Sequence, residues 1–196
     1  MAENATQCLH NITTLRGAAV RDALAWSSYL GESISLYSEK TEVAFGSRHW
    51  PTWGKERVYT YFTQQRDLYA FLHDQTVRLI YHGLTGIEIA EDFTHPPKLQ
   101  TAWHTQGFYG SVSHNDKAIY QRYMTWFDGN PSHVWEHPPV EYARRYVDCM
   151  GGAEEVIKKA QGYIKQGDLR FAATRLDHVV FSDPENKAEK IMLAST

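Results

Sequence analysis

The chain has 196 residues, of which 42% are hydrophobic and 22% charged, and its net charge is −3. This composition is typical of a soluble globular protein with one generous domain or two small ones. The sequence has no block rich in lysine and arginine, which argues against nucleic acid or a membrane surface as a partner. No stretch reaches the ~20 apolar residues of a membrane span. Cys8 and Cys149 lie far apart without a C-x-x-C spacing, which argues against a disulfide framework and a zinc–thiolate site.

The opening segment, MAENATQCLHNITTLRG, carries a carboxylate, amides, a histidine and an arginine where chains usually fray. Side chains of these types bind metals and anions. We therefore expect the segment to form the middle of a site, with the earlier half of that site absent from the sequence.

The first predicted helix follows this segment and ends at Gly31, because apolar residues recur at helical intervals in Leu15, Ala19, Ala23, Trp26 and Leu30. Residues 41–54, TEVAFGSRHWPTWG, alternate through Val43 and Phe45 and then become rich in Gly, Ser and Pro. This pattern predicts a short buried strand that runs into a loop at the edge of a sheet. A helix followed by a strand indicates α/β layering, in which sites tend to lie beyond the strand ends.

The middle of the chain is predicted to be helical. One long helix covers residues 54–83 and stops at Gly83, a shorter one covers 84–93, and a third starts with Ser113 as its N-cap. A turn is expected at 128–131, where the sequence is Asp-Gly-Asn-Pro. Aromatic residues crowd into 59–71 and 109–135, which suggests large apolar surfaces packed between helices or across subunits.

In the last region of the chain, the sequence predicts successive helices over 138–152, 153–168, 169–186 and 187–193, with Gly or Pro between them. Its small residues and the G-D-x-x-x-A-A spacing resemble a tetratricopeptide hairpin. One such unit cannot bury its own apolar face. We expect it to cap a larger helical bundle or to pack against another chain.

An anion site is one interpretation of Asn11, Arg16 and Arg21, which fall in a loop and the first turns of the predicted helix. A helix N-terminus attracts anions, and guanidinium groups bind sulfate or phosphate through paired hydrogen bonds. The alternative is that both arginines are solvated, or paired with Asp22 and Glu32.

A metal site is a weaker interpretation. The chain has ten histidines, but they show no H-x-H or H-x-H-x-D-H run, and most lie at spacings that favour structural roles. Glu3 and His49 stand out, because a histidine at the end of the predicted strand can meet a carboxylate, and both are zinc ligands. Two ligands do not close a zinc site.

Four segments together resemble the class III alkyl sulfatases: AENATQCLHNITTLRGAAVRDALAW, RHWPTWGKERV, QRDLYAFLHDQTVRL and GFYGSVSHNDKAIYQRYMTWFDGNPSHV. The closing GDLRFAATRLDHVVFSDPEN resembles the end of that family's dimerisation domain. The resemblance implies a zinc-dependent hydrolase that splits alkyl sulfates, including dodecyl sulfate, into alcohol and sulfate. Family members combine a metallo-β-lactamase-like domain, a helical dimerisation domain and a sterol-carrier-like domain.

The resemblance also implies roles for individual residues. Glu3 matches a glutamate that bridges two zinc ions. Asn11, Arg16 and Arg21 fall where the family holds the sulfate group, and Tyr109 matches a tyrosine that reaches the same anion from the helical domain. This supports the anion-site interpretation of the arginines. His10 lies next to that site and is given no role.

The sequence also departs from the family pattern. The H-x-H-x-D-H run and an earlier glutamate ligand are absent, and so is the sterol-carrier-like domain. Arg48 occupies the position of the metal-binding histidine, which leaves His49 as the neighbouring candidate ligand, and Gln7 replaces a frequent histidine. Because a binuclear site makes hydroxide only when coordination around each ion is fixed, we expect no hydrolysis by this chain alone.

We therefore expect an α+β chain. Residues 1–63 are predicted to be a short C-terminal remnant of a metallo-β-lactamase-like α/β sandwich. Residues 64–196 are predicted to be a mainly α-helical dimerisation domain that ends in the tetratricopeptide-like hairpin and forms a homodimer.

The predicted function is part of an alkyl sulfatase that carries the sulfate-binding and dimerisation regions. The alternative is a non-catalytic dimerisation or scaffold protein derived from the same family. A tetratricopeptide-like peptide-binding module is weaker, because only one hairpin is recognisable. Family members are often periplasmic or secreted, and the sequence does not decide the compartment.

Overall fold

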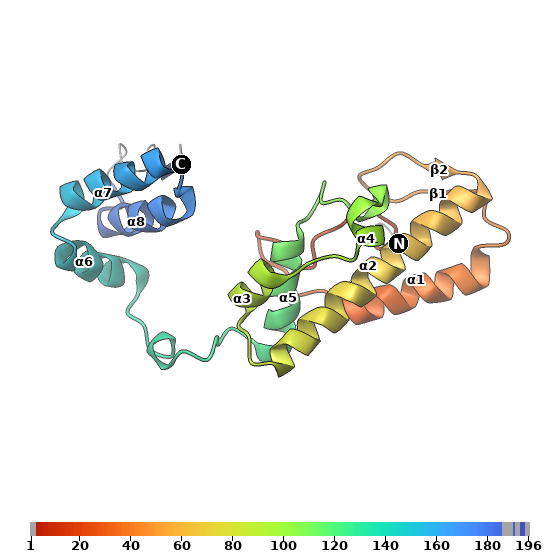
Figure 1. Ribbon diagram of the computed structural model, residues 1–196, viewed down its shortest axis with the longest axis horizontal. Helices are drawn as coiled ribbons and strands as arrows, with labels where there is room; N and C mark the ends of the chain where they lie inside the picture. The colour runs from red at the N-terminus through yellow and green to blue at the C-terminus, as the bar shows by residue number, and fades with distance from the viewer. Residues whose placement is uncertain (1–2, 186–189, 191–192, 195–196) are drawn as a thin grey trace. The chain divides into compact units, whose positions relative to one another are not determined.

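The computed structural model describes residues 3–185, 190 and 193–194. The chain folds as two compact units, unit 1 (Met1–Gly129) and unit 2 (Asn130–Thr196). Both are predominantly helical, and the strands in the described ranges form one small sheet in unit 1 (Figure 1). None of the helices in the described ranges has the length and apolar content of a membrane span.

Unit 1 is organised around one long helix, α2 (Lys55–Tyr81), with α1 (Ala23–Tyr37) packed along it (Figure 1). Helix α5 (Val112–Met124) also packs on α2, and α3 (Gly86–Asp92) packs on α5. The remaining elements are α4 (Pro97–Thr101), the 3-10 turn η1 (Trp103–Thr105) and the antiparallel strands β1 (Val43–Ala44) and β2 (Thr52–Trp53), in which Val43 pairs with Trp53.

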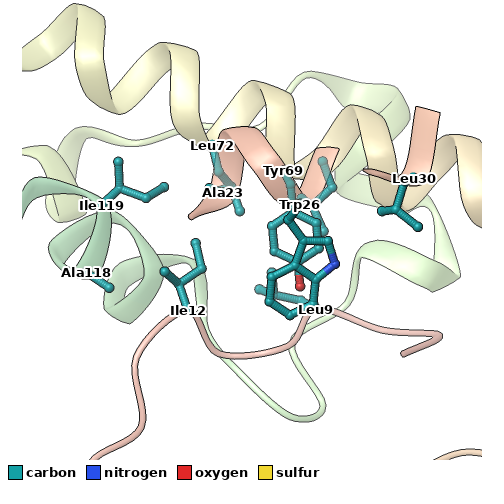
Figure 2. Close-up of a cluster of buried hydrophobic side chains, with 10 residues drawn as sticks. Leu9, Ile12, Ala23, Trp26, Leu30, Tyr69, Leu72, Ala118 and Ile119 are labelled. Atoms are coloured by element: carbon teal, nitrogen blue, oxygen red, sulfur yellow. The ribbon is translucent and has the colours of Figure 1, made fainter. Parts of the chain in front are cut away.

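The main core of unit 1 lies where α1, α2 and α5 meet the N-terminal segment (Figure 2). Trp26 of α1 stacks on Tyr69 of α2, with ring centroids 4.5 Å apart and planes inclined by 17°. Leu9 and Ile12 are fully buried in the same cluster. The cluster as a whole contains Leu9, Ile12, Ala23, Trp26, Leu30, Leu68, Tyr69, Leu72, Ala118 and Ile119. Burial of these apolar side chains holds the N-terminal segment in place.

Backbone contacts also fix this segment. His10 and Tyr109 form an isolated parallel β-bridge, and the Asn115 side chain of α5 donates a hydrogen bond to the His10 carbonyl at 3.0 Å. Gly110 allows the two segments to approach, because a Cβ there would lie 2.9 Å from the Asn11 nitrogen. The glycine is therefore required by close packing.

Unit 2 contains η2 (Pro131–His133), α6 (Pro139–Cys149), α7 (Ala153–Gln166) and α8 (Leu169–Ser182). Helices α6 and α7 both pack on α8. The side chains that the three helices bury together are Ala143, Val147, Val156, Ala160, Ala172, Leu176 and Val179. The helices predicted over 138–152, 153–168 and 169–186 are confirmed, whereas most of 187–193 lies outside the described residues.

Three predictions about helix ends are wrong. Helix α1 starts after Asp22, whose side chain accepts a hydrogen bond from the Ala25 N–H at 2.9 Å, and it continues through Gly31 to Tyr37. Helix α5 starts after Ser111 instead of Ser113. In both cases a side-chain cap defines the start of the helix more strongly than apolar periodicity does. The long helix that ends before Gly83 is confirmed, and Gly83 has a φ of 86°.

The predicted buried strand is also wrong in detail. Strand β1 has two residues, and its buried side chain is Ala44, while Val43 and Phe45 are 41% and 72% exposed. Strand β1 packs against α2, where Ala44 lies in a buried cluster with Val58 and Tyr61. The α+β class is thus confirmed in a coarse form, as a mainly helical protein with one small two-stranded sheet. The boundary at 63/64 falls within α2 and stays a prediction.

Candidate functional site

A cluster of charged side chains gathers at Glu3 in unit 1. The Oε2 atom of Glu3 lies 2.5 Å from Arg21 Nη2, and its Oε1 atom lies 3.3 Å from Arg48 Nη2. Arg21 comes from the segment before α1 and Arg48 from the loop between β1 and β2. The hydrogen bond from Arg21 is the main reason that the pKa of Glu3 lies below its usual value.

Arg21 is held from a second side by Asn11. Its Nη1 atom donates to the Asn11 side-chain oxygen at 3.0 Å and to the Asn11 carbonyl at 3.1 Å. The structure does not pair Arg21 with Asp22, which caps α1 and forms an ion pair with Arg122 at 2.7 Å. The predicted anion residues Asn11 and Arg21 therefore lie together, and Arg21 is an ordered, partly buried cation.

Arg48 is oriented by Tyr109. The guanidinium carbon of Arg48 lies 4.3 Å from the centroid of the Tyr109 ring, a distance typical of a cation–π contact. Arg48 also has a φ of 81°, a backbone conformation that side-chain-bearing residues rarely adopt. The predicted residue Tyr109 thus reaches the cluster through Arg48.

His10 lies beneath the cluster and is 1% exposed. Its Nδ1 atom is 2.9 Å from the Asn11 carbonyl, so Nδ1 carries the proton and Nε2 carries a lone pair. Nε2 is buried and has no hydrogen-bond partner among the residues that the structure describes. Burial lowers the pKa of His10 and keeps the imidazole neutral.

Arg16 is not brought into this cluster. Its side chain is exposed in the loop before α1, and it makes no hydrogen bond or ion pair with the described part of the chain. Asn11, Arg16 and Arg21 were predicted to lie in a loop and the first turns of a helix. The helical part of this prediction is wrong, because all three residues precede α1. At the N-terminus of α1, the Ala25 N–H donates to the Asp22 side chain that caps the helix.

The predicted metal ligands have other partners. His49 Nε2 lies 3.0 Å from the sulfur of Cys8, and Glu3 has one guanidinium on each carboxylate oxygen. Among the described residues, no three His, Cys, Asp or Glu side chains are grouped as metal ligands would be. Zinc sites in proteins use three or four such ligands. Glu3 and His49 by themselves do not make up such a ligand set.

Two cavities border the cluster. One of about 410 Å³ is lined by Glu3, Arg21 and Trp26, together with Asn4, Asp22, Ala25 and Tyr29. The other, of about 490 Å³, is lined in part by Asn11 and Tyr109. Its wall combines apolar and polar side chains, including Leu15, Phe108, His114 and Lys117. This wall therefore offers both apolar surface and polar groups to a ligand.

Sequence reasoning gave no binding role to Arg48 or His10. The position of His10 next to Asn11 is a signal that could have found it. Arg48 offers no such signal, because its contacts with Glu3 and Tyr109 join residues far apart in the sequence.

The chain is similar to several known proteins. Residues 85–196 match the family described as alkyl sulfatase dimerisation. A linear primary-alkylsulfatase from a Pseudomonas species is 47% identical over 193 residues, which cover 98% of this chain and 29% of that protein. The alkyl/aryl-sulfatase BDS1 of Saccharomyces cerevisiae is 41% identical, over 99% of this chain and 30% of that protein.

A solved structure has the same fold. The stereoselective inverting sec-alkylsulfatase Pisa1 from a Pseudomonas species matches with a TM-score of 0.93 and 43% identity, over 98% of this chain and 31% of that one. The chain therefore spans less than a third of the length of these relatives. Since the dimerisation family covers more than half of the chain, the chain belongs to the alkyl sulfatase family, and residues 85–196 form its dimerisation domain.

Proposed function

We propose that this chain is the sulfate-binding and self-associating part of an alkyl sulfatase. The observation that carries the proposal is the position of Arg21, which Asn11 and Glu3 hold at the wall of a cavity. Guanidinium groups in a fixed orientation bind the oxygens of sulfate groups through charge-assisted hydrogen bonds. The names of the relatives support sulfate esters as the ligand class.

An alkyl sulfate has an anionic head and an apolar tail, and the two cavities offer surfaces for both. We place the head at Arg21 and Asn11, and the tail against Leu15 and Phe108, which are 93% and 64% exposed. Arg16 is proposed as a further sulfate-binding residue, because its exposed side chain is free to turn toward a bound anion. Tyr109 lines the cavity that holds Leu15 and Phe108, and its ring positions Arg48.

Hydrolysis of the ester is proposed to need residues beyond this chain. The family that the sequence resembles is zinc-dependent, and bound zinc would supply hydroxide at neutral pH by lowering the pKa of water. The described residues do not bring together the ligands that such ions need. The chain alone is therefore proposed to bind alkyl sulfates without cleaving them.

We propose that the dimerisation domain forms a homodimer. In unit 2, large apolar side chains stay exposed, including Trp135 at 95%, Leu169 at 45% and Phe181 at 42%. Burying such side chains against a second copy is favourable. The α7–α8 pair is proposed to be a tetratricopeptide-like hairpin, and residues 1–63 a remnant of a metallo-β-lactamase-like domain. Sedimentation that shows only a monomer at micromolar concentration would contradict the homodimer.

A second candidate is a non-catalytic dimerisation protein of the same family. Arg48 favours it, because this side chain pairs with Glu3 and an arginine does not ligate zinc. The two candidates differ in what the whole protein does, and both keep the anion site. Release of sulfate from an alkyl sulfate by the whole protein would favour the alkyl sulfatase over the non-catalytic dimerisation protein.

Thermal stability in the presence of sulfate tests the proposal. We expect sodium sulfate, at constant ionic strength, to raise the melting temperature of the purified chain, and we expect Arg16→Ala with Arg21→Ala to abolish this rise. The same chain incubated with zinc and dodecyl sulfate should release no sulfate. An unchanged rise in the double variant, or robust turnover by the chain alone, would contradict the proposal.

A further inference from the structure

The carboxylate of Glu3 has the contacts of an anion bound by two arginines. Each of its oxygens accepts a hydrogen bond from a different guanidinium, Arg21 at 2.5 Å and Arg48 at 3.3 Å. The three side chains are each about one quarter to one third exposed. The adjacent cavity of about 410 Å³ is lined by Glu3 and Arg21, so a ligand in it would meet the Glu3 carboxylate and the Arg21 guanidinium.

Arg48 is fixed by three independent features. It pairs with Glu3, it lies over the Tyr109 ring, and its backbone adopts a φ of 81°. Strained backbone conformations of this kind cluster at functional sites. Among the described residues, Glu3 is the hydrogen-bond acceptor of Arg48, which leaves most of the five guanidinium N–H groups available to a ligand.

We propose that Glu3 is the internal counter-anion of a two-arginine cradle formed by Arg21 and Arg48, and that this cradle binds a sulfate group without a metal ion. The inference rests on the proposed sulfate-binding function and adds Arg48 to its residues. Two guanidinium charges face one carboxylate charge, so the cluster keeps one net positive charge for the ligand. A bound sulfate would accept hydrogen bonds from the guanidinium N–H groups of Arg21 and Arg48 that donate to Glu3 in the free protein.

This arrangement and a metal-centred site predict opposite effects of removing the Glu3 charge. In the cradle, the carboxylate competes with the ligand, so its removal strengthens sulfate binding. In a metal-centred site, the carboxylate holds the ion that attracts sulfate, so its removal weakens binding. The direction of the change separates the two.

The first experiment is calorimetric titration of the chain with sodium sulfate, in EDTA and at constant ionic strength. Glu3→Gln keeps the shape of the side chain and is expected to bind sulfate about threefold to fivefold more tightly, the range of one partly exposed ion pair. Glu42→Gln, which changes an exposed glutamate near β1, is the matched control and should leave the affinity unchanged. Weaker binding by Glu3→Gln, or binding by the wild type that needs added zinc, would overturn the proposal.

The second experiment changes Arg48. Arg48→Met removes the charge and is expected to bind sulfate about tenfold more weakly, since one charge-assisted hydrogen bond is lost. Arg48→Lys should recover part of the affinity, and Arg78→Met, at the far end of α2, should have no effect. Far-ultraviolet circular dichroism confirms that each variant is folded. Equal affinity of Arg48→Met and the wild type would overturn the role of Arg48.

These results separate the inference from the proposed function. Suppose that the wild type binds sulfate, that Arg21→Met weakens this binding and that Arg48→Met leaves it unchanged. The sulfate site would then stand, and the proposed two-arginine cradle would be wrong. If the wild type does not bind sulfate in EDTA or with zinc, both are wrong.

Discussion

Unit 1 and unit 2 reach their structures through different kinds of contact. In unit 2, neighbours in the sequence determine the hairpin: Gly167 ends α7 with a φ of 82°, and Asp168 caps α8 by accepting a hydrogen bond from the Phe171 N–H at 3.1 Å. In unit 1, the charged cluster joins Glu3 to Arg48 across 45 positions of the sequence. Local signals therefore suffice for the helical hairpin, whereas the charged cluster, the proposed anion site, depends on contacts between residues far apart in the sequence.

Glycine-to-alanine changes in the two units should have opposite effects. Gly110→Ala would place a Cβ 2.9 Å from the backbone of Asn11, so we expect it to lower the free energy of unfolding of unit 1 by about 3 kcal/mol. Gly162→Ala is the matched control, because its Cβ meets nothing within 4 Å and alanine favours helix α7 by about 1 kcal/mol. Urea unfolding of the full chain measures both. Similar stability of the two variants would contradict the close packing at Gly110.

The buried carboxyl of Asp116 should make unit 1 sensitive to pH. Burial raises the pKa of Asp116 to about 8, and its Oδ2 atom has no hydrogen-bond partner in the described structure. The folded protein therefore keeps a proton that the unfolded chain loses near its ordinary pKa of 3.8, so the stability of unit 1 falls as pH rises from about 4 to about 8.

The variant Asp116→Asn removes this titration. At pH 8 we expect it to be more stable than the wild type by about 2 kcal/mol, while at pH 4 the two should differ little. Thermal melts at several pH values measure the difference. A wild-type stability that does not change between pH 4 and pH 8 would show that the Asp116 carboxyl titrates normally.

The cap of α8 offers a smaller change confined to unit 2. Asp168→Ala removes the acceptor for the Phe171 N–H and should cost about 1 kcal/mol of stability. Asp168→Asn keeps an acceptor and should cost much less. Neither variant should alter sulfate binding, because Asp168 lies in unit 2 and the proposed anion site lies in unit 1. Loss of sulfate binding in Asp168→Ala would contradict that separation.

Sequence reasoning predicts the helical elements best where one local signal acts alone. The end of the helix before Gly83 was predictable, because the glycine is the local signal that ends the helix and no other capping residue shifts that end. The start of α1 was not, because apolar residues continue the helical rhythm back to Leu15 while the Asp22 side chain sets the true start. The prediction for strand β1 was wrong for a related reason. The alternation of apolar and polar residues does not reveal that Ala44, and not Phe45, faces α2.

The candidate site was predictable only in part. Asn11, Arg21 and Tyr109 follow from the family resemblance, and the structure brings them to one cluster. The pairing of Glu3 with Arg48 could not be predicted, because it depends on where the β1–β2 loop lies relative to the N-terminal segment. Charged pairs between loops leave no periodic pattern in the sequence.

The central claim is that Asn11, Arg21 and Tyr109 belong to one anion site in unit 1. Titration of the isotope-labelled chain with sodium sulfate at constant ionic strength, followed by amide NMR, tests it most directly. We expect saturable shifts at these three residues and at Arg48, and no shifts in α6, α7 or α8. Shifts centred on unit 2, or shifts that grow without saturating, would contradict it.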